Sequence, residues 1–228
     1  MSAYASQALP DRQSVIVDLI VSMAWMVERN VDRAIQALLQ RDEQLAGAVF
    51  LDEPRINEAE ILIDERILKY LRGNDLKEDE VRLMVATLKV NKDLERMGDL
   101  AVNIAQRVIS LTYCSAVKNP PELQPMAIAV SHMCRKTLRS LIYQDLVLAR
   151  SVLESDDQID SFRDHVFQRL REQMSGNPSE VAQDVELLLA SRHLERIADH
   201  ATNIAEDVIF WLRGVDVRHG RLENLIED

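Results

Sequence analysis

The sequence LERMGDLAVNIA at residues 94–105 returns as LERIADHATNIA at residues 194–205, one hundred positions further along the chain. Eight of the twelve positions carry the same residue in both stretches. An internal duplication explains this match better than chance does, because copies of one supersecondary unit leave similarity at a fixed period. The chain is therefore expected to contain two copies of one structural unit.

The duplication extends well beyond these twelve residues. A Gly-Asn pair at residues 73–74 returns at residues 176–177, at an offset of 103, and the offset then falls to 100. The connection after this pair is thus three residues shorter in the second copy, and surface turns are where such length changes are tolerated. The pattern predicts two repeats, at residues 1–116 and 117–228.

The composition favours packed helices. Of the 228 residues, 47% are hydrophobic and only 4% are aromatic, and glycine and proline occur six times each, which is typical of a helical protein and too few turn residues for a β-sandwich. The net charge of −11 argues against nucleic acid or an anionic membrane as a partner, since no excess of Lys and Arg neutralises phosphates. It suits cations or a partner with a basic patch.

Nothing in the sequence indicates export or membrane insertion. The most apolar early stretch, Ser14 to Val27, is broken by Asp18 and is too short to span a bilayer. No signal peptide is evident at the N-terminus. Cys114 and Cys134 lie outside any metal-ligand spacing and fit buried thiols in a reducing compartment. We therefore expect a cytoplasmic protein with no direct membrane insertion.

Helical periodicity predicts three helices in each copy, at residues 11–41, 42–72 and 77–111 and at residues 123–143, 145–174 and 177–213. Pro54 is expected to bend or interrupt its helix, because a proline inside a helix removes a backbone hydrogen bond. Asn177 is the expected N-cap of the last helix, with Pro178 at its first position, and Gly214 is its expected stop.

Apolar residues in the last helix of each copy recur at alternating spacings of three and four, which is typical of a helical-bundle seam. They are Leu94, Met97, Ala101, Ile104 and Val108, then Leu194, Ile197, Ala201, Ile204 and Val208. The sequence therefore predicts an all-α protein of two tandem, pseudo-symmetric antiparallel three-helix bundles, laid end to end.

Oxygen-bearing side chains recur at i, i+4 and i+8 on the same two helices, roughly opposite the apolar seam. They are Glu95, Asp99 and Asn103, then Glu195, Asp199 and Asn203. Two carboxylates one helical turn apart repel each other, and a bound cation would reverse that effect. Carboxylate and amide oxygens suit magnesium, manganese, calcium or iron. Further acids on the preceding helices could complete such a site: Glu60, Asp64, Asp160 and Asp164.

Ordinary surface ion pairs offer a second explanation for the same stripe. Opposite charges lie at i, i+3 in both copies: Lys92 with Glu95, Arg96 with Asp99, Arg192 with Glu195, and Arg196 with Asp199. Spacing alone leaves both explanations open. A di-iron enzyme is disfavoured because that class needs Glu-x-x-His, and the positions in question are Gly98 and Ala198. No phosphate-binding loop or nucleophile elbow is present.

Across residues 15–214 the chain resembles the PhoU family of bacterial phosphate-signalling proteins. The resemblance rests on a doubled Glu-x-x-x-Asp motif in a Leu-Glu-Arg-Ile-Gly-Asp context, which here reads LERMGD and LERIAD. The second copy departs from that context at Ala198, where glycine is usual, and at His200 after the aspartate. Neither change removes an oxygen ligand.

The resemblance implies two three-helix repeats in a non-enzymatic negative regulator of phosphate uptake and phosphate-starvation signalling. Such a regulator links the ATPase subunit of a phosphate ABC transporter to a sensor histidine kinase, and commonly forms a homodimer. The resemblance also implies metal binding, foremost of iron, with manganese, magnesium or zinc as alternatives. The implied ligands are Glu95, Asp99, Glu195 and Asp199, with Asn103 and Asn203 as helpers. A metal-free helical adaptor is the alternative.

Overall fold

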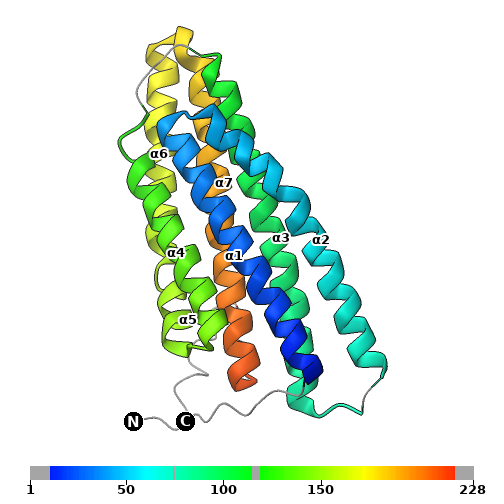
Figure 1. Cartoon of the computed structure of the whole chain (residues 1–228). Helices are drawn as coiled ribbons and strands as arrows, with labels where there is room; N and C mark the ends of the chain where they lie inside the picture. Colours follow the sequence, from blue (N-terminus) through cyan, green and yellow to red (C-terminus); the bar gives the residue numbers. More distant parts are fainter. Residues whose placement is uncertain (1–10, 74, 115–118, 219–228) are drawn as a thin grey trace.

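The computed structural model describes residues 11–73, 75–114 and 119–218, and all regular secondary structure within these residues is helical. The helices are α1 (Asp11–Gln40), α2 (Glu43–Arg72), α3 (Glu78–Thr112), α4 (Leu123–Tyr143), α5 (Leu146–Leu153), α6 (Asp156–Gly176), a short 3₁₀ turn η1 (Pro178–Glu180), and α7 (Val181–Arg213). The predicted all-α fold class is confirmed (Figure 1). The predicted boundary between residues 116 and 117 lies outside the described residues.

The duplication is visible in the way the second helix of each repeat begins. The Asp42 carboxylate accepts hydrogen bonds from the backbone N–H groups of the second and third residues after it, and Asp145 does the same one repeat later. The residue before each cap, Arg41 or Gln144, is left-handed with φ 54°. Because a side-chain cap satisfies otherwise unpaired N–H groups, this pair of turns fixes two helix starts.

Pro54 does not interrupt its helix, contrary to one of the outcomes expected for it. α2 runs continuously through this exposed proline, although the proline supplies no N–H to the carbonyl four residues earlier. The interruption lies instead in the second repeat, between α5 and α6, where one helix over residues 145–174 was expected. There the Ser155 hydroxyl donates to the Ser151 carbonyl and the Ser155 N–H turns to the Val152 carbonyl, so these bonds compete with the helical ladder.

The last helix ends as expected but begins differently. Asn177 precedes the 3₁₀ turn η1, and α7 starts only at Val181, because the Glu180 N–H donates to the Asn177 carbonyl three residues back, which makes the first turn 3₁₀. Gly214 closes α7 in the left-handed conformation with φ 70°, and its N–H donates to the Phe210 carbonyl. Glycine suits this position because the left-handed conformation is strained for side chains with a Cβ.

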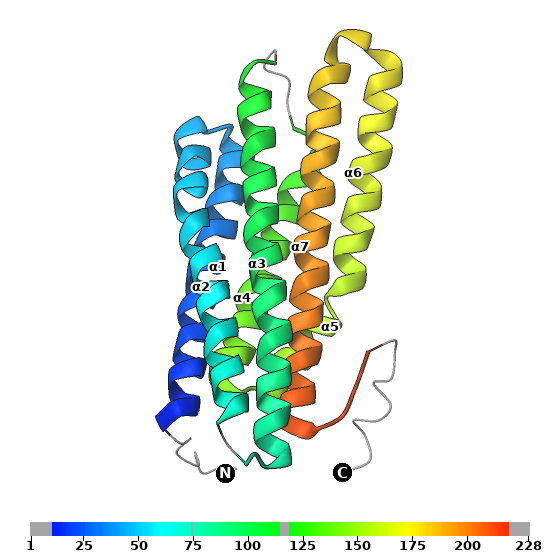
Figure 2. The ribbon, with the colours of Figure 1, turned by 90° about the vertical axis from the view of Figure 1, so that its right-hand side faces the viewer.

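The two three-helix units lie side by side, so the expectation that they are laid end to end is wrong. α3 and α7 run antiparallel along the middle of the molecule, α1 and α2 flank them on one side, and α4 to α6 flank them on the other (Figures 1 and 2). The reason is visible in α3, where the consecutive residues Leu100, Ala101 and Val102 are all buried. Three consecutive positions cannot share one face of a helix, so α3 packs against both repeats.

A single hydrophobic core results from this arrangement. Buried apolar side chains form one cluster that runs from Ile16 on α1 to Val217 after α7, and the predicted seam residues of both repeats are among them. Within the described residues, none of the helices combines the length and the apolar character needed to cross a membrane.

Candidate metal centre

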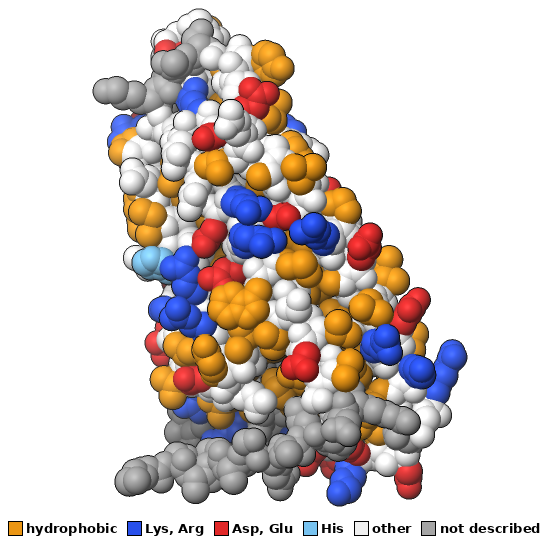
Figure 3. Space-filling model, viewed as in Figure 1, with side chains coloured by type: hydrophobic (Ala, Val, Ile, Leu, Met, Phe, Trp, Pro, Cys, Tyr) orange, Lys and Arg blue, Asp and Glu red, His pale blue; other side chains and the backbone are white. Residues whose placement is uncertain are grey.

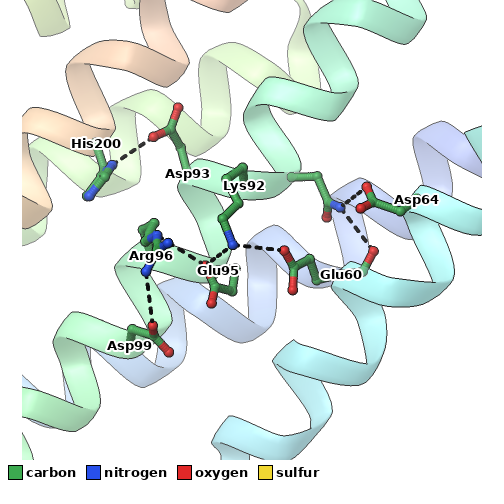
Figure 4. Close-up of polar contacts among 9 residues, drawn as sticks. Glu60, Asp64, Lys92, Asp93, Glu95, Arg96, Asp99 and His200 are labelled. Carbon is green, nitrogen blue, oxygen red and sulfur yellow. Dashed lines mark hydrogen bonds and ion pairs between the residues drawn. The ribbon is translucent and has the colours of Figure 1, made fainter.

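In the first repeat, the acidic motif lies against the second helix of its own bundle. Lys92 of α3 reaches between two carboxylates, with its Nζ 3.2 Å from Glu60 Oε1 and 2.9 Å from Glu95 Oε2 (Figure 4). Arg96 lies on the other side, with Nη1 3.8 Å from Asp99 Oδ2 and Nε 3.6 Å from Glu95 Oε2. The ion pairs expected for this copy are therefore formed, and Glu60 joins them.

These contacts set the protonation of the first-repeat groups. The hydrogen bond that Lys92 donates to Glu95 is the main reason why the pKa of Lys92 lies above its ordinary value. Burial is the main reason why the pKa of Asp99 is raised, and the charges of Glu95 and Glu53 raise it further. Glu53 of α2 is thus a neighbour of the motif that the sequence analysis missed.

Asp64 does not join Glu95 and Asp99. The Asn91 amide donates to Asp64 Oδ1 over 2.9 Å and to the Glu60 carbonyl over 3.0 Å, and Asn91 itself is buried. Figure 4 shows this contact beyond Glu60, further along α3 from Asp99. Asp64 therefore holds α2 against α3, as a buried amide needs a hydrogen-bond partner.

In the second repeat the same motif has a different electrostatic environment. Burial is the main reason why the pKa of Asp199 is raised, and the charges of Glu195, Asp156 and Asp160 raise it further. The pKa of Asp156, on α6, is raised by burial too, although the Thr202 hydroxyl donates to it over 3.2 Å. Acids of α6 thus lie close enough to Asp199 of α7 to raise its pKa.

In the part of the chain that the structure describes, the ion pairs expected from Arg192 to Glu195 and from Arg196 to Asp199 are not formed, and the charge of His200 offsets only part of the rise in the pKa of Asp199. Arg163 lies 3.4 Å from both Asp160 and Asp164, and Asp164 is exposed. The two repeats thus place the same carboxylate motif in a compensated and an uncompensated environment.

Sequence reasoning missed Glu53 and Asp156, although a signal for them was present. They are separated by 103 positions, which is the offset already established for this part of the chain. The charge of Glu53 raises the pKa of Asp99, and the charge of Asp156 raises the pKa of Asp199. A carboxylate retained at equivalent positions of both copies could therefore have been added to the candidate set.

The two asparagines of the motif do not act alike. Asn203 reaches across to the first repeat, where its amide lies 3.5 Å from Asp93 Oδ1. His200 approaches the same oxygen, with Nδ1 2.7 Å away (Figure 4). Asn103 is partly buried on α3. Asn203 therefore belongs to the contact between the repeats.

The donor set fits an oxygen-liganded cation better in the second repeat than in the first. There, burial and neighbouring carboxylates raise the pKa values of Asp156 and Asp199, and a bound cation would offset both effects. In the first repeat Lys92 and Arg96 already occupy that role. Over the described ranges, no three His, Cys, Asp or Glu side chains are gathered closely enough to hold a single ion, so binding would require side-chain rotation.

Comparison with known proteins identifies the family. The PhoU domain model matches residues 20–108 and 123–208. A phosphate-specific transport system accessory protein PhoU homolog from Pseudomonas putida is 34% identical over 209 residues, covering 90% of this chain and 81% of the relative.

Two solved structures share the fold. The crystal structure of PhoU from Pseudomonas aeruginosa aligns with a TM-score of 0.87 and 31% identity, covering 90% of this chain and 98% of that one. The phosphate transport system regulatory protein PhoU from Streptococcus pneumoniae, at 22% identity, aligns with a TM-score of 0.81 over 90% of this chain and 96% of its own, and shows the fold alone. With two matched domains and relatives above 30% identity along nearly its whole length, the chain belongs to the PhoU family.

Proposed function

We propose that this chain is a non-enzymatic, cytoplasmic negative regulator of phosphate uptake and of phosphate-starvation signalling. It acts as a metal-binding adaptor between the ATPase subunit of a phosphate ABC transporter and a sensor histidine kinase, and works as a homodimer. Family membership supports the regulatory role, since relatives of similar length are named as accessory proteins of the phosphate-specific transport system. A likeness of fold alone would not have sufficed for this step.

The acidic cluster of the second repeat is the observation that carries the metal-binding part. Glu195, Asp156 and Asp160 all raise the pKa of Asp199, and of these acids only Asp160 forms an ion pair within the described residues, with Arg163. They would hold a cation through carboxylate oxygens, which suits iron, manganese or magnesium better than zinc, whose protein ligands are mostly nitrogen and sulfur. The bound ion would neutralise the cluster and draw α6 and α7 together.

The first repeat would bind a cation more weakly. Glu95, Asp99 and Glu53 supply the corresponding oxygens, but Lys92 and Arg96 must first turn away from them. Each displaced ion pair subtracts from the affinity, although exposed pairs contribute little individually. We therefore expect one tighter and one weaker site in each chain.

Metal analysis tests this part directly. Protein purified without chelator and then titrated with Mn²⁺ or Fe²⁺ should bind at least one ion per chain. The double variant Asp156→Asn with Asp199→Asn should lose the tighter site. A matched control, Glu65→Gln with Glu172→Gln, changes the charge equally at exposed positions of α2 and α6 and should retain it. Equal binding by both double variants would contradict the assignment.

A deletion strain tests the regulatory part. Cells lacking this chain should express alkaline phosphatase and take up phosphate at high external phosphate, and the intact gene should restore repression. Unchanged phosphatase and uptake would contradict the regulatory role. The metal-site variants should then show whether repression needs the ion.

A metal-free helical adaptor is the second candidate, and the compensated first repeat favours it. Lys92 and Arg96 satisfy the motif there without any ion. This candidate predicts less than a tenth of an ion per chain after supplementation, and full repression by the variant Asp156→Asn with Asp199→Asn.

A further inference from the structure

One face of the molecule carries a half-exposed tryptophan among arginines, away from both acidic motifs. Trp25 of α1 is 49% exposed, and the core positions around it on α1 are filled by Met23, Ala24 and Val27. Figure 3 shows blue side chains gathered across the middle of α1, directly above a broad orange patch. We call this face the Trp25 surface; its residues are Trp25, Glu28, Arg29, Asp32, Arg33, Asp52, Arg55, Arg135 and Arg139.

Ion pairs hold the arginines of this surface on both flanks of Trp25. On the α2 side, Arg29 lies 3.4 Å from Asp52, and Arg33 also contacts that carboxylate. On the α4 side, Arg135 lies 3.1 Å from Glu28 and 2.9 Å from Asp32 of α1. Glu28 and Arg29 come three and four residues after Trp25 on the same helix, so the indole lies between these two flanks.

Two further arginines extend the flanks and make no ion pair among the residues that the structure describes. Arg55 comes three residues after Asp52 on α2, Arg139 comes four residues after Arg135 on α4, and both are exposed. The Trp25 surface thus has five arginines against three carboxylates, on a chain whose net charge is −11. A locally positive face on an acidic protein complements an acidic ligand and steers its approach.

The residue types match those of a protein interface. Tryptophan and arginine are the residues most enriched at the energetic centres of protein–protein contacts, where an aromatic anchor is enclosed by a polar rim. Arginines already held in place by carboxylates lose little freedom when a partner arrives. Nucleic acid and anionic lipid fit less well, because the surface's own three carboxylates repel a dense array of phosphates.

We propose that the Trp25 surface docks an acidic segment of a partner protein, with an apolar side chain of the partner against Trp25. Aspartates or glutamates on the same segment form ion pairs with Arg55 and Arg139, and also contact the exposed side of the Arg29 guanidinium, which remains paired with Asp52. The inference deepens the proposed adaptor role and rests on it, but it involves none of the acidic-cluster residues.

Site-specific photo-crosslinking in the native host tests the proposal. Full-length chain with Trp25→p-benzoylphenylalanine should crosslink to one protein, through a peptide that is net negative and contains apolar residues. The same probe at Ile61 is the control: Ile61 is 59% exposed and lies nine residues after Asp52, which is half a turn away on α2. Crosslinks equal to those at Ile61, or to a basic peptide, a lipid, a nucleic acid or a second copy of this chain, would overturn the proposal.

Charge-reversal variants provide a second test in the same crosslinking assay. Arg139→Glu, which breaks no ion pair within the described residues, should reduce the crosslink at position 25 at least tenfold, whereas Arg171→Glu, an exposed and equally unpaired arginine of α6, should leave it unchanged. Equal crosslinking by both variants would overturn the electrostatic part. Normal phosphate regulation in the deletion strain, together with an intact acidic crosslink in cells that carry the probe-labelled chain, would reject the proposed function and keep the surface.

Discussion

Asp93 of α3 and His200 of α7 lie 2.7 Å apart, Oδ1 to Nδ1, and this contact joins the two repeats. Each side chain is 17% exposed, so solvent screens the pair only in part. The positions one hundred residues away are His193 and Leu100, so the pseudo-symmetry does not reproduce the contact. The departure of the second motif from its family context therefore has a structural role, since His200 binds the other repeat.

A double-mutant cycle should detect this contact between the repeats in the stability of the whole protein. Asp93→Ala and His200→Ala should each lower the free energy of unfolding in urea, with a coupling energy of about 1 kcal/mol between them because the hydrogen bond is partly buried. The exposed pair Asp160 and Arg163, 3.4 Å apart, should give a coupling near zero. A coupling energy between positions 93 and 200 no larger than that of the control pair would show that this contact does not stabilise the protein.

A second prediction concerns the close approach of α2 and α3 at Gly98. A Cβ built there would lie 3.3 Å from two atoms of Ile56, which is tighter than ordinary contact. Gly98→Val should therefore lower the free energy of unfolding by about 2 kcal/mol through overpacking. Gly98→Ala gains helix propensity of about 1 kcal/mol and loses a similar amount to Ile56, so its net effect should be small.

The matched test is the pair Gly98→Ala with Ile56→Val. Removing Cδ1, one of the two Ile56 atoms that crowd the position, should make the alanine more favourable than it is in the native background, giving a favourable coupling in thermal unfolding. Simple additivity of the two changes would show that Ile56 does not limit this position.

A third prediction is the pH dependence introduced by Glu206. Burial, and then the charge of Asp207, raises the pKa of Glu206 to about 6. A carboxyl whose pKa is raised on folding stabilises the protein below its unfolded pKa, and this contribution is lost as the pH rises through the folded value. Glu206→Gln should thus match the wild type near pH 4 and exceed it above about pH 7, by about 1 kcal/mol because solvent screens a half-exposed group.

The measurement is the free energy of unfolding in urea at several pH values between these limits. Glu65→Gln, at an exposed position of α2, is the control and should show no such difference. A constant gap between Glu206→Gln and the wild type at every pH would contradict the prediction.

The helix inventory was predictable where local chemistry decides it. The Asp42 and Asp145 caps and the Gly214 stop act within one turn, so the sequence pattern alone reveals them. The break between α5 and α6 was not predictable, because a serine such as Ser155 can either continue a helix or form a hydrogen bond with the nearby backbone.

The side-by-side packing and the electrostatics of the site depend on contacts between distant residues. The apolar seam of α3 indicates one partner face, and the burial of Val102 next to it shows a second. Spacing also could not distinguish an ion pair from a cation site. The structure places Lys92 between Glu60 and Glu95 in one repeat, while Arg192, its equivalent one hundred residues later, leaves its glutamate uncompensated.

A fourth prediction follows from that difference between the repeats. Lys92→Met removes the cation between Glu60 and Glu95 and keeps a long apolar stem. The freed carboxylates repel each other, which costs stability without metal and favours cation binding. Calorimetric titration with Mn²⁺ should show the weaker site tightening about tenfold, while Arg192→Met should leave the affinities unchanged. No gain for Lys92→Met would show that Lys92 does not compete with the ion.

The last prediction uses the fluorescence of the Trp25 surface. The chain has two tryptophans, and Trp211 lies against a small apolar cavity between α1, α3 and α7, so Trp211→Phe leaves Trp25 as the only reporter. Arginines beside an exposed indole attract anions and repel cations within a Debye length of about 8 Å at physiological salt. Iodide should therefore quench Trp25 more strongly than caesium does at equal ionic strength.

Adding Arg55→Glu and Arg139→Glu should remove or reverse that preference, whereas adding Arg171→Glu should not, because Arg171 lies on α6. Equal quenching by iodide and caesium in the Trp211→Phe protein would mean that the carboxylates Glu28, Asp32 and Asp52 cancel the arginine field, and an acidic partner would then gain nothing from this face.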